Sequence, residues 1–268
     1  MATVSTPVLL FRPELASKYE LQHAAKYFPI ETSRVRCADS LVIGRYSVLP
    51  MYQELERDLD MLGSRLINSY EQHRWITGFE YYADMAGFTP ETWDDSNFSR
   101  CTHRGPFVVK GKMSSRKRRW DTHMFAKTRA DALKLAERLK EDGEIAEQGV
   151  VYRRYVPLKT LQVGPHGLPY TNEWRFYYLG ERRLSVGYYW SMADCAAQAV
   201  LPPEAIALGD KLAAIAAKRA NFFTLDLAET ETGEWILIEI NDGQTAVPSE
   251  NDLDELYGNL RDALKTFS

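Results

Sequence analysis

The stretch FFTLDLAETETGEWILIEINDGQ, residues 222–244, reads as two β-strands joined by a turn at Thr232-Gly233. Side chains alternate between the two faces of a strand. If the turn centres on this pair, Asp226 lies directly across from Glu239, and Asn241 follows two residues along on the same face. Directly opposed side chains have Cβ atoms roughly 5 Å apart, so the two carboxylates would repel each other. A register shift of one residue would separate them, so the prediction depends on the turn.

A divalent cation between the carboxylates would remove this repulsion. Two carboxylates and an amide oxygen are hard ligands, of the kind that bind Mg²⁺ together with waters or phosphate oxygens. The sequence therefore predicts a metal site at Asp226, Glu239 and Asn241. The alternative is an ordinary amphipathic hairpin with its polar face in water. Trp235 and Leu237 argue against that alternative, because strand alternation places both apolar side chains on the acidic face.

The composition is that of a globular protein with a sizeable core, because 45% of its 268 residues are hydrophobic and 26% are charged. A formal net charge of −4 argues against broad coating of nucleic acid but allows a local basic patch. No apolar run approaches transmembrane length, and the N-terminal MATVSTP lacks a basic region followed by an apolar block. Cys37, Cys101 and Cys195 are widely spaced. We therefore expect structural thiols and a cytoplasmic protein without a membrane partner.

Strand-like and helix-like segments alternate over roughly the first ninety residues, with short apolar runs at Val8–Phe11 and Leu41–Ile43. This alternation is typical of a small open α/β unit. A polar, turn-rich stretch from Thr89 to Gly105 follows, and a strong strand over Pro106–Lys110 begins the next unit. Further strands and helices alternate to the end of the chain.

A basic loop, KGKMSSRKRRW, continues from the strand that ends at Lys110. It holds six basic side chains in ten residues, four of them consecutive from Arg116 to Arg119. Such a cluster needs an anion. The candidates are polyphosphate, nucleic-acid backbone, or only the salt around a mobile loop. Because Lys110 belongs to a strand it is held in place, and a positioned lysine is a suitable point charge for a phosphate.

A third polar cluster lies in NEWRFYYL, residues 172–179, where Glu173 and Arg175 share one face of an expected strand. An ion pair within the sheet is the common interpretation. The functional alternative places Arg175 on a phosphate or on a substrate carboxylate. The segment 151–156, VYRRYV, has the character of a hinge whose backbone contacts a base.

Together these residues resemble the ATP-grasp superfamily, from roughly Leu66 to the C-terminus. The resemblance implies an α/β (α+β) fold in which two α+β lobes grip ATP, preceded by a small α/β pre-ATP-grasp lobe. The implied lobes are residues 1–95 for the pre-ATP-grasp lobe, 96–150 for the N-terminal lobe with its phosphate-covering loop, and 151–268 for the C-terminal lobe with the metal site. ATP and Mg²⁺ are the implied cofactors.

Individual motifs carry this resemblance. VVK at 108–110 is similar to the family's phosphate-binding lysine strand, 151–156 to its interlobe strand, and Asp226 with the E-x-N at 239–241 to its metal set. The tail IEINDGQ, the loop KGKxSSRK and the segment EWRF resemble a clade named for two arginines and a lysine. The loop departs from the family, because SSRKRR stands where glycines are usual, which hints at a larger anionic substrate.

The resemblance also implies roles for single residues. Lys110 is its catalytic lysine, and Arg116 and Arg175 are its catalytic arginines. The implied nucleotide-binding residues are Lys110, Lys112, Arg74, Tyr152, Arg153, Tyr155, Glu173 and Arg175.

Three functions agree with these features. The leading hypothesis is an ADP-forming ligase that joins a carboxylate to an amine through an acyl phosphate, with ATP and Mg²⁺. The second is an ATP-grasp kinase for a small molecule or a nucleic-acid end. The third is a non-catalytic module that binds RNA through Arg116–Arg119 and Trp120, and RNA or another anionic substrate is in any case an alternative partner for the loop at 110–119. A Walker-type loop and the H-E-x-x-H and G-x-S-x-G motifs are absent from the sequence.

Overall fold

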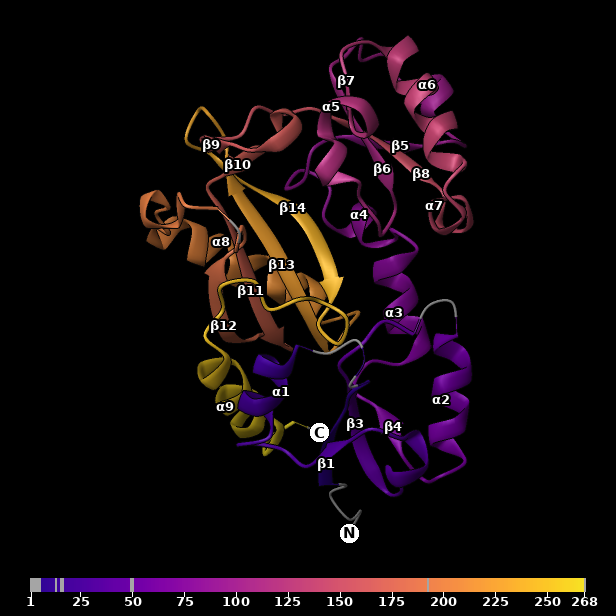
Figure 1. Ribbon diagram of the computed structural model, residues 1–268, viewed down its shortest axis with the longest axis vertical. Helices are drawn as coiled ribbons and strands as arrows, with labels where there is room; N and C mark the ends of the chain where they lie inside the picture. Colours follow the sequence, from indigo (N-terminus) through magenta and orange to yellow (C-terminus); the bar gives the residue numbers. More distant parts are fainter. Residues whose placement is uncertain (1–5, 13, 15–16, 49–50, 192, 268) are drawn as a thin grey trace.

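The computed structural model describes residues 6–12, 14, 17–48, 51–191 and 193–267. Residues 1–5, on which the expectation about the N-terminus partly rests, lie outside this description. The described residues form three four-stranded sheets and one two-stranded sheet, with helices packed on them (Figure 1). Within these residues, none of the helices has the length and apolar character that spanning a membrane requires.

The N-terminal sheet is parallel, as the alternation of strands and helices predicts, and has the order β2-β1-β3-β4. The expected apolar runs form β1 and β3, which are central and buried. The strands are β1 (Thr6–Leu10), β2 (Ile30–Glu31), β3 (Ser40–Gly44) and β4 (Arg65–Leu66), with helices α1 (Lys18–Ala24), α2 (Tyr52–Asp60) and, leading away from the sheet, α3 (Tyr70–Thr77) and α4 (Tyr81–Asp84).

The middle sheet is antiparallel, with the order β5-β8-β6-β7. Its strands are β5 (Thr92–Asp94), β6 (Phe107–Gly111), β7 (Phe125–Ala126) and β8 (Val150–Arg154), with α5 (Trp120–His123), α6 (Arg129–Lys140) and α7 (Gly143–Gln148). Strand β5 joins this sheet, although the predicted boundary at 95 leaves it in the preceding lobe. Strand β8 also joins it, although the predicted boundary at 150 cuts through the start of this strand. We therefore propose a middle lobe that runs from β5 to β8.

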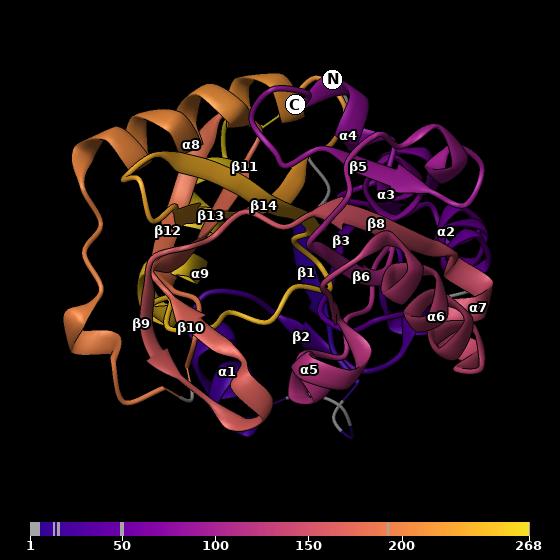
Figure 2. The same ribbon diagram turned by 90° about the horizontal axis from the view of Figure 1, so that it is seen from above.

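The C-terminal sheet is also antiparallel, with the order β12-β11-β13-β14. Helix α8 packs against one face through apolar side chains such as Leu212 and Ala213, and the other face borders the middle lobe (Figure 2). The elements are β9 (Thr160–Val163), β10 (Pro169–Thr171), β11 (Glu173–Leu179), β12 (Arg182–Tyr188), β13 (Phe222–Glu229), β14 (Trp235–Asp242), α8 (Pro203–Ala216) and α9 (Leu253–Leu264).

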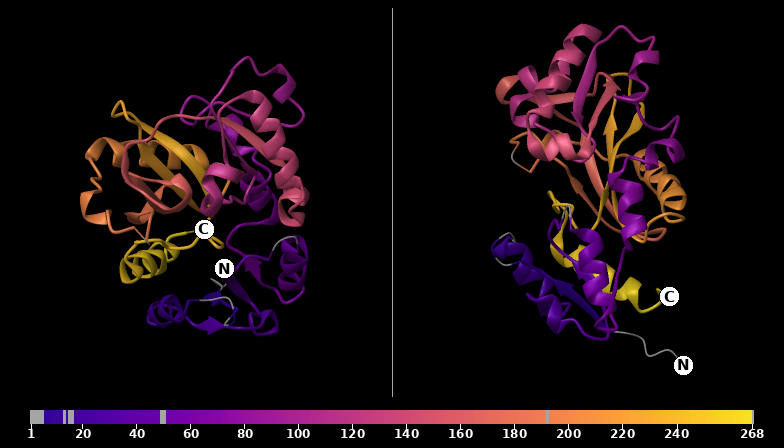
Figure 3. Two further views of the ribbon diagram at one scale, coloured as in Figure 1. Left: turned by 45° about the horizontal axis from the view of Figure 1, so that its top comes forward. Right: turned by 90° about the vertical axis from the view of Figure 1, so that its right-hand side faces the viewer.

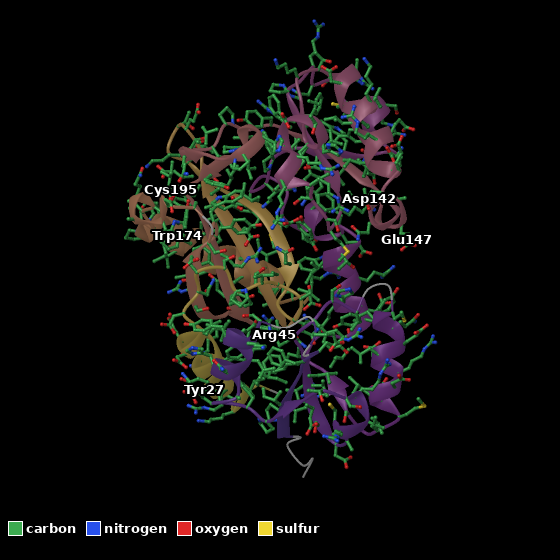
Figure 4. The ribbon with its side chains drawn as sticks, in the orientation of Figure 1. Tyr27, Arg45, Asp142, Glu147, Trp174 and Cys195 are labelled. Atoms are coloured by element: carbon green, nitrogen blue, oxygen red, sulfur yellow. The ribbon has the colours of Figure 1, made fainter. Side chains whose placement is uncertain are left out.

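The N-terminal sheet and the C-terminal sheet share one core. Helix α9 lies beside the N-terminal sheet (Figure 3), and Leu256 packs in one cluster with Leu9 and Tyr177. Arg45, labelled in Figure 4, lies at this junction and is buried. Its guanidinium binds Glu20 and donates to the backbone oxygens of Gly243 and Ala246. This buried cation therefore fixes the loop that follows β14.

The predicted pairing of Asp226 with Glu239 is confirmed, but the turn that produces it differs from the expected one. The turn closes where the amide of Thr230 donates to the oxygen of Glu234 at 2.8 Å, and Leu227 pairs with Leu237. This register is one residue away from the predicted one. A β-bulge lies between the Leu227 pair and the Asp226 pair. Its one extra residue on β14 shifts the register back to the predicted one from Asp226 onward.

The bulge changes which apolar side chains accompany the acids. Leu237 and Trp235 pack on the α8 side of the sheet, so the expectation that both lie on the acidic face is wrong. Ile236 and Ile238 line the cavity on the acidic side instead. The argument against a solvated hairpin still holds, because this face is covered by the middle lobe.

Candidate active site

Two adjoining cavities lie between the middle sheet and the C-terminal sheet. The first is about 830 Å³, including its open mouth, and its walls are largely apolar, with Met124, Leu168 and Ile238 among them. The second is about 960 Å³ and more polar. Ser115 and Glu239 line both cavities, so the two cavities meet at these residues. An apolar cavity beside a more polar one suits a ligand with one apolar end and one charged end.

Lys110 and Glu239 connect the two sheets at this junction. Lys110, on β6, donates from Nζ to Oε1 of Glu239, on β14. Burial lowers the pKa of Lys110, even though the Glu239 carboxylate acts in the opposite direction. Burial acts to raise the pKa of Glu239, but the charges of Lys110 and Lys117 outweigh it and hold this pKa below its ordinary value. The two side chains therefore form a buried ion pair between the sheets.

Arg175 and Asp226 form a second buried pair, across β11 and β13. The guanidinium donates to Oδ1 and Oδ2 of Asp226 at 2.8 and 2.7 Å, and to the backbone oxygen of Val247 at 2.7 Å. Asn241 donates from Nδ2 to Oδ2 of Asp226 at 3.3 Å. Burial acts to lower the pKa of Arg175, but Asp226 outweighs it and raises this pKa.

These two ion pairs offset the predicted repulsion between Asp226 and Glu239. Each carboxylate already has a cationic side chain beside it, so a metal ion is not needed to relieve the repulsion between them. Within the described ranges, no group of three or more acidic, histidine or cysteine side chains has the arrangement of a metal site.

The donor set nevertheless fits Mg²⁺. Oε2 of Glu239, the oxygen opposite the one that Lys110 binds, and Oδ1 of Asn241 are oxygen donors from residues that line the second cavity. Mg²⁺ commonly binds through one or two carboxylates together with phosphate oxygens. Asp226 is buried, with 1% of its surface exposed, and its carboxylate binds Arg175. It also accepts the hydrogen bond from Asn241, so it helps to position that residue.

In the basic loop, the structure brings Lys117 rather than Arg116 to the cavities. Lys117 lines the first cavity, donates from Nζ to the hydroxyl of Tyr189 at 2.6 Å, and lies 4.9 Å from the ring centre of Trp190. Arg116 turns toward the connection between α6 and α7, where its Nε donates to Oδ2 of Asp142 at 2.9 Å. The prediction of Arg116 rests on its position in a run of four cations, and spacing within such a run does not show which one turns inward.

The predicted nucleotide-binding residues divide into two groups. Arg153, Tyr155 and Glu173 line the first cavity, and Lys112 lines the second. Tyr152 instead lies in the core of the middle lobe. Strand alternation on β8 explains this, because it directs Tyr152 and Arg153 to opposite faces.

Arg74 lies away from both cavities. It is exposed on α3 and pairs with Glu71 at 3.0 Å and with Glu80 at 3.6 Å. The prediction that it binds nucleotide is therefore not supported by its position, and Arg74 is a surface residue of the N-terminal region.

Glu173 is the buried acid of the first cavity. Its Oε2 accepts a hydrogen bond from Thr171 at 3.2 Å, while Oε1 is buried and has no hydrogen-bond partner in the described part of the chain. Burial raises the pKa of Glu173 to about 7, against the opposing charge of Lys117. An unpaired buried oxygen at a cavity wall is suited to accept a hydrogen bond from a ligand.

This pKa predicts a pH dependence of stability. Between pH 4.5, the ordinary value, and about 7, the folded carboxyl keeps a proton that the unfolded chain has lost, so stability falls as pH rises. Glu173→Gln removes this fall, which for such a shift is at most on the order of 3 kcal/mol. Urea unfolding of the nucleotide-free protein across this window measures it. Glu231→Gln, in the exposed turn, should keep the wild-type slope, and equal slopes for wild type and Glu173→Gln would contradict the prediction.

Two sheets that enclose joined cavities, with a lysine on one sheet and an acid-x-amide strand on the other, define an ATP-grasp fold. The chain belongs to an ATP-grasp domain family, family 3 of the clade named for two arginines and a lysine, whose model matches residues 98–260, more than half of the chain. The predicted resemblance and the predicted fold class are both confirmed. No curated protein matches the chain.

Solved structures show the same fold over nearly the whole chain. A RimK domain protein ATP-grasp from Sphaerobacter thermophilus is 13% identical, with a TM-score of 0.60 and coverage of 97% of this chain and 99% of that one. D-alanine–D-alanine ligase from Bacillus anthracis, complexed with ATP, is 10% identical, with a TM-score of 0.59 and 97% coverage of both chains. The ATP-grasp ligase PsnB, complexed with minimal precursor, Mg and ADP, is 13% identical, with a TM-score of 0.54 and 97% coverage of both.

Proposed function

We propose that the protein is an ATP- and Mg²⁺-dependent ligase that joins a carboxylate to an amine and forms ADP. The observation that carries this proposal is the junction of the two cavities, where Lys110 on the middle sheet pairs with Glu239 on the C-terminal sheet, which also holds the Arg175–Asp226 pair. The first cavity suits the base of ATP, and the second suits its phosphates together with a second substrate. The ligases among the structural neighbours support this proposal.

The side chains around the junction divide the work of positioning and charge neutralisation. Lys110 and Lys117 line the first cavity, and their charges act on Glu239, where the two cavities meet. Arg175 lines the second cavity. Glu239 and Asn241, supported by Asp226, would hold Mg²⁺, which when bound neutralises phosphate charge. Phosphoryl transfer depends mostly on such positioning and electrostatic stabilisation.

The proposed reaction has two steps. The γ-phosphoryl group passes from ATP to a carboxylate oxygen of the second substrate, and ADP leaves. An amine then attacks the carbonyl carbon of the acyl phosphate, phosphate leaves with the bonding electrons, and the amine loses a proton to solvent. The carboxylate and the amine together with ATP account for all atoms of the amide, ADP and phosphate.

A screen for ADP release tests this proposal. The protein is incubated with ATP, Mg²⁺ and pools of amino acids, peptides and tRNA, and ADP, phosphate and products are quantified. A ligase releases ADP and phosphate in step with an amide. Release of ADP with a phosphorylated acceptor and no free phosphate would support the kinase alternative instead. Absence of any stimulated ADP release across the pools would contradict the ligase.

The comparisons give no support to the RNA-binding alternative, and the basic loop weakens it. Lys117 turns into the first cavity and Arg116 binds Asp142, so two of the four consecutive cations are committed within the protein.

Lys117→Met is expected to raise the KM for ATP at least about tenfold, because a charge-assisted contact to a phosphate contributes roughly 1.5–3 kcal/mol. Arg118→Met is the matched control, since Arg118 is the next residue and is exposed. Steady-state kinetics over a range of ATP concentrations measures the effect. An equal change in both variants would show that only the net charge of the loop matters, and would contradict a specific role for Lys117.

A further inference from the structure

A third cavity of about 970 Å³ lies in the N-terminal lobe, outside the carboxyl ends of its parallel strands. Arg12 follows β1, Arg34 follows β2, and Tyr46 and Ser47 follow β3, and all four residues line it. In the order β2-β1-β3-β4, the chain adds β2 on one side of β1 and β3 on the other. The cavity therefore lies at the topological switch point, which is where open parallel sheets bind their ligands.

The charge in this cavity favours an anion. The guanidinium of Arg12 lies 5.8 Å from the ring centre of Tyr46, on the same cavity as Arg34. Arg12 pairs with Glu14 at 2.9 Å and Arg34 pairs with Asp58, and all four side chains are at least 40% exposed. Exposed pairs of this kind contribute little to stability, so both arginines can exchange them for a ligand at small cost. A carboxylate is the group that a guanidinium fork binds best.

The same cavity also offers apolar contact. Val35 and Met51 line it and are 70% and 57% exposed, and Val48 and Leu55 lie deeper along its wall. Large apolar side chains exposed at the rim of a polar cavity are typical of a binding site. The ligand therefore combines an anionic group with an apolar side chain.

Ser47 connects this cavity to the reaction site. It lines both the third cavity and the second cavity, where Arg175, Glu239 and Asn241 lie. The third cavity and the second cavity therefore adjoin at Ser47, so one elongated molecule can extend from the arginines of the N-terminal lobe toward Glu239.

We propose that the third cavity binds the distal end of the substrate that supplies the amine, and that this end is a carboxylate next to an apolar side chain, as at the C-terminus of a short peptide whose amino end reacts. The assignment of the reacting end to the second cavity rests on the proposed function. The chemistry of the distal end rests on Arg12, Arg34 and the apolar rim alone.

The test compares alanyl-leucine with alanyl-leucinamide, which lacks the carboxylate. Binding to the full chain is measured by calorimetry, with and without ADP and Mg²⁺. The wild type is expected to bind the acid about tenfold more tightly than the amide, as loss of a charge-assisted hydrogen bond predicts. The double variant Arg12→Ala, Arg34→Ala should lose this preference. Arg74→Ala should keep it, because Arg74 is an equally exposed and ion-paired arginine outside the three cavities.

The outcomes separate this inference from the proposed function. Equal affinity for acid and amide, no binding of the acid, or a preference that survives in the double variant would each overturn the inference. If the double variant does not fold, the comparison of acid with amide on the wild type decides. A preference for the acid in a protein that shows no ADP release with any substrate would contradict the proposed function and leave the N-terminal site standing.

Discussion

Glu239→Gln is expected to lower ATP turnover by at least about 100-fold, which is the effect of removing one well-placed electrostatic group from a transition state. The carboxylate lies where the two cavities meet and faces Lys110 across the two sheets. An amide of the same shape can neither bind Mg²⁺ as strongly nor neutralise the buried lysine. The loss is measured as ADP release with the substrates found by the screen, or as intrinsic hydrolysis, across a Mg²⁺ titration.

Glu231→Gln provides the matched control, because Glu231 belongs to the same hairpin and is exposed in its turn. It should retain wild-type turnover. Thermal unfolding of both variants separates loss of chemistry from loss of fold. Undiminished turnover by folded Glu239→Gln would refute its place in the proposed Mg–ATP site.

Arg175→Ala is expected to destabilise the protein by about 3–5 kcal/mol, because it leaves the carboxylate of Asp226 buried and unpaired. Asp226 is only 1% exposed, and Arg175 supplies both of its charged hydrogen bonds. The variant also loses the donor to the oxygen of Val247. Urea unfolding at neutral pH measures the change in free energy.

Arg183→Ala is the control for this prediction, since Arg183 lies on the neighbouring strand and pairs with half-exposed Asp210 at 2.8 Å. It should cost no more than about 1 kcal/mol. A double variant, Arg175→Met with Asp226→Leu, removes both charges and should recover most of the stability without recovering ATP turnover. Equal costs for Arg175→Ala and Arg183→Ala would show that burial of the pair carries no energetic weight.

Much of the site was predictable because it lies on one hairpin and two strands with clear alternation. The pairing of Asp226 with Glu239 follows from a local turn, and Lys110 follows from a strongly patterned strand. The predicted register is nevertheless wrong by one residue at the turn. The bulge on β14 corrects it, and bulges depend on packing across the sheet rather than on local pattern.

The partner of Arg175 shows what local pattern does not contain. The sequence placed it on the same face as Glu173, but its ion pair is with Asp226, on a strand that is a neighbour only in the folded sheet. Similarly, Lys117 rather than Arg116 lines the first cavity. The short helical turn that begins at Lys117 directs the Lys117 side chain toward Tyr189.

The residues themselves specify the ATP-grasp fold, the strand that carries Lys110, and the face that carries Asp226, Glu239 and Asn241, because alternation along a strand is a property of the local chain. Only the tertiary structure decides which cations neutralise those acids and which loop residue reaches them. These contacts join segments that are distant in sequence. They form because folding buries the charged side chains, and a buried charge without a partner is strongly destabilising. The hairpin therefore reads as a metal site in sequence and as half of a charged junction in the folded protein.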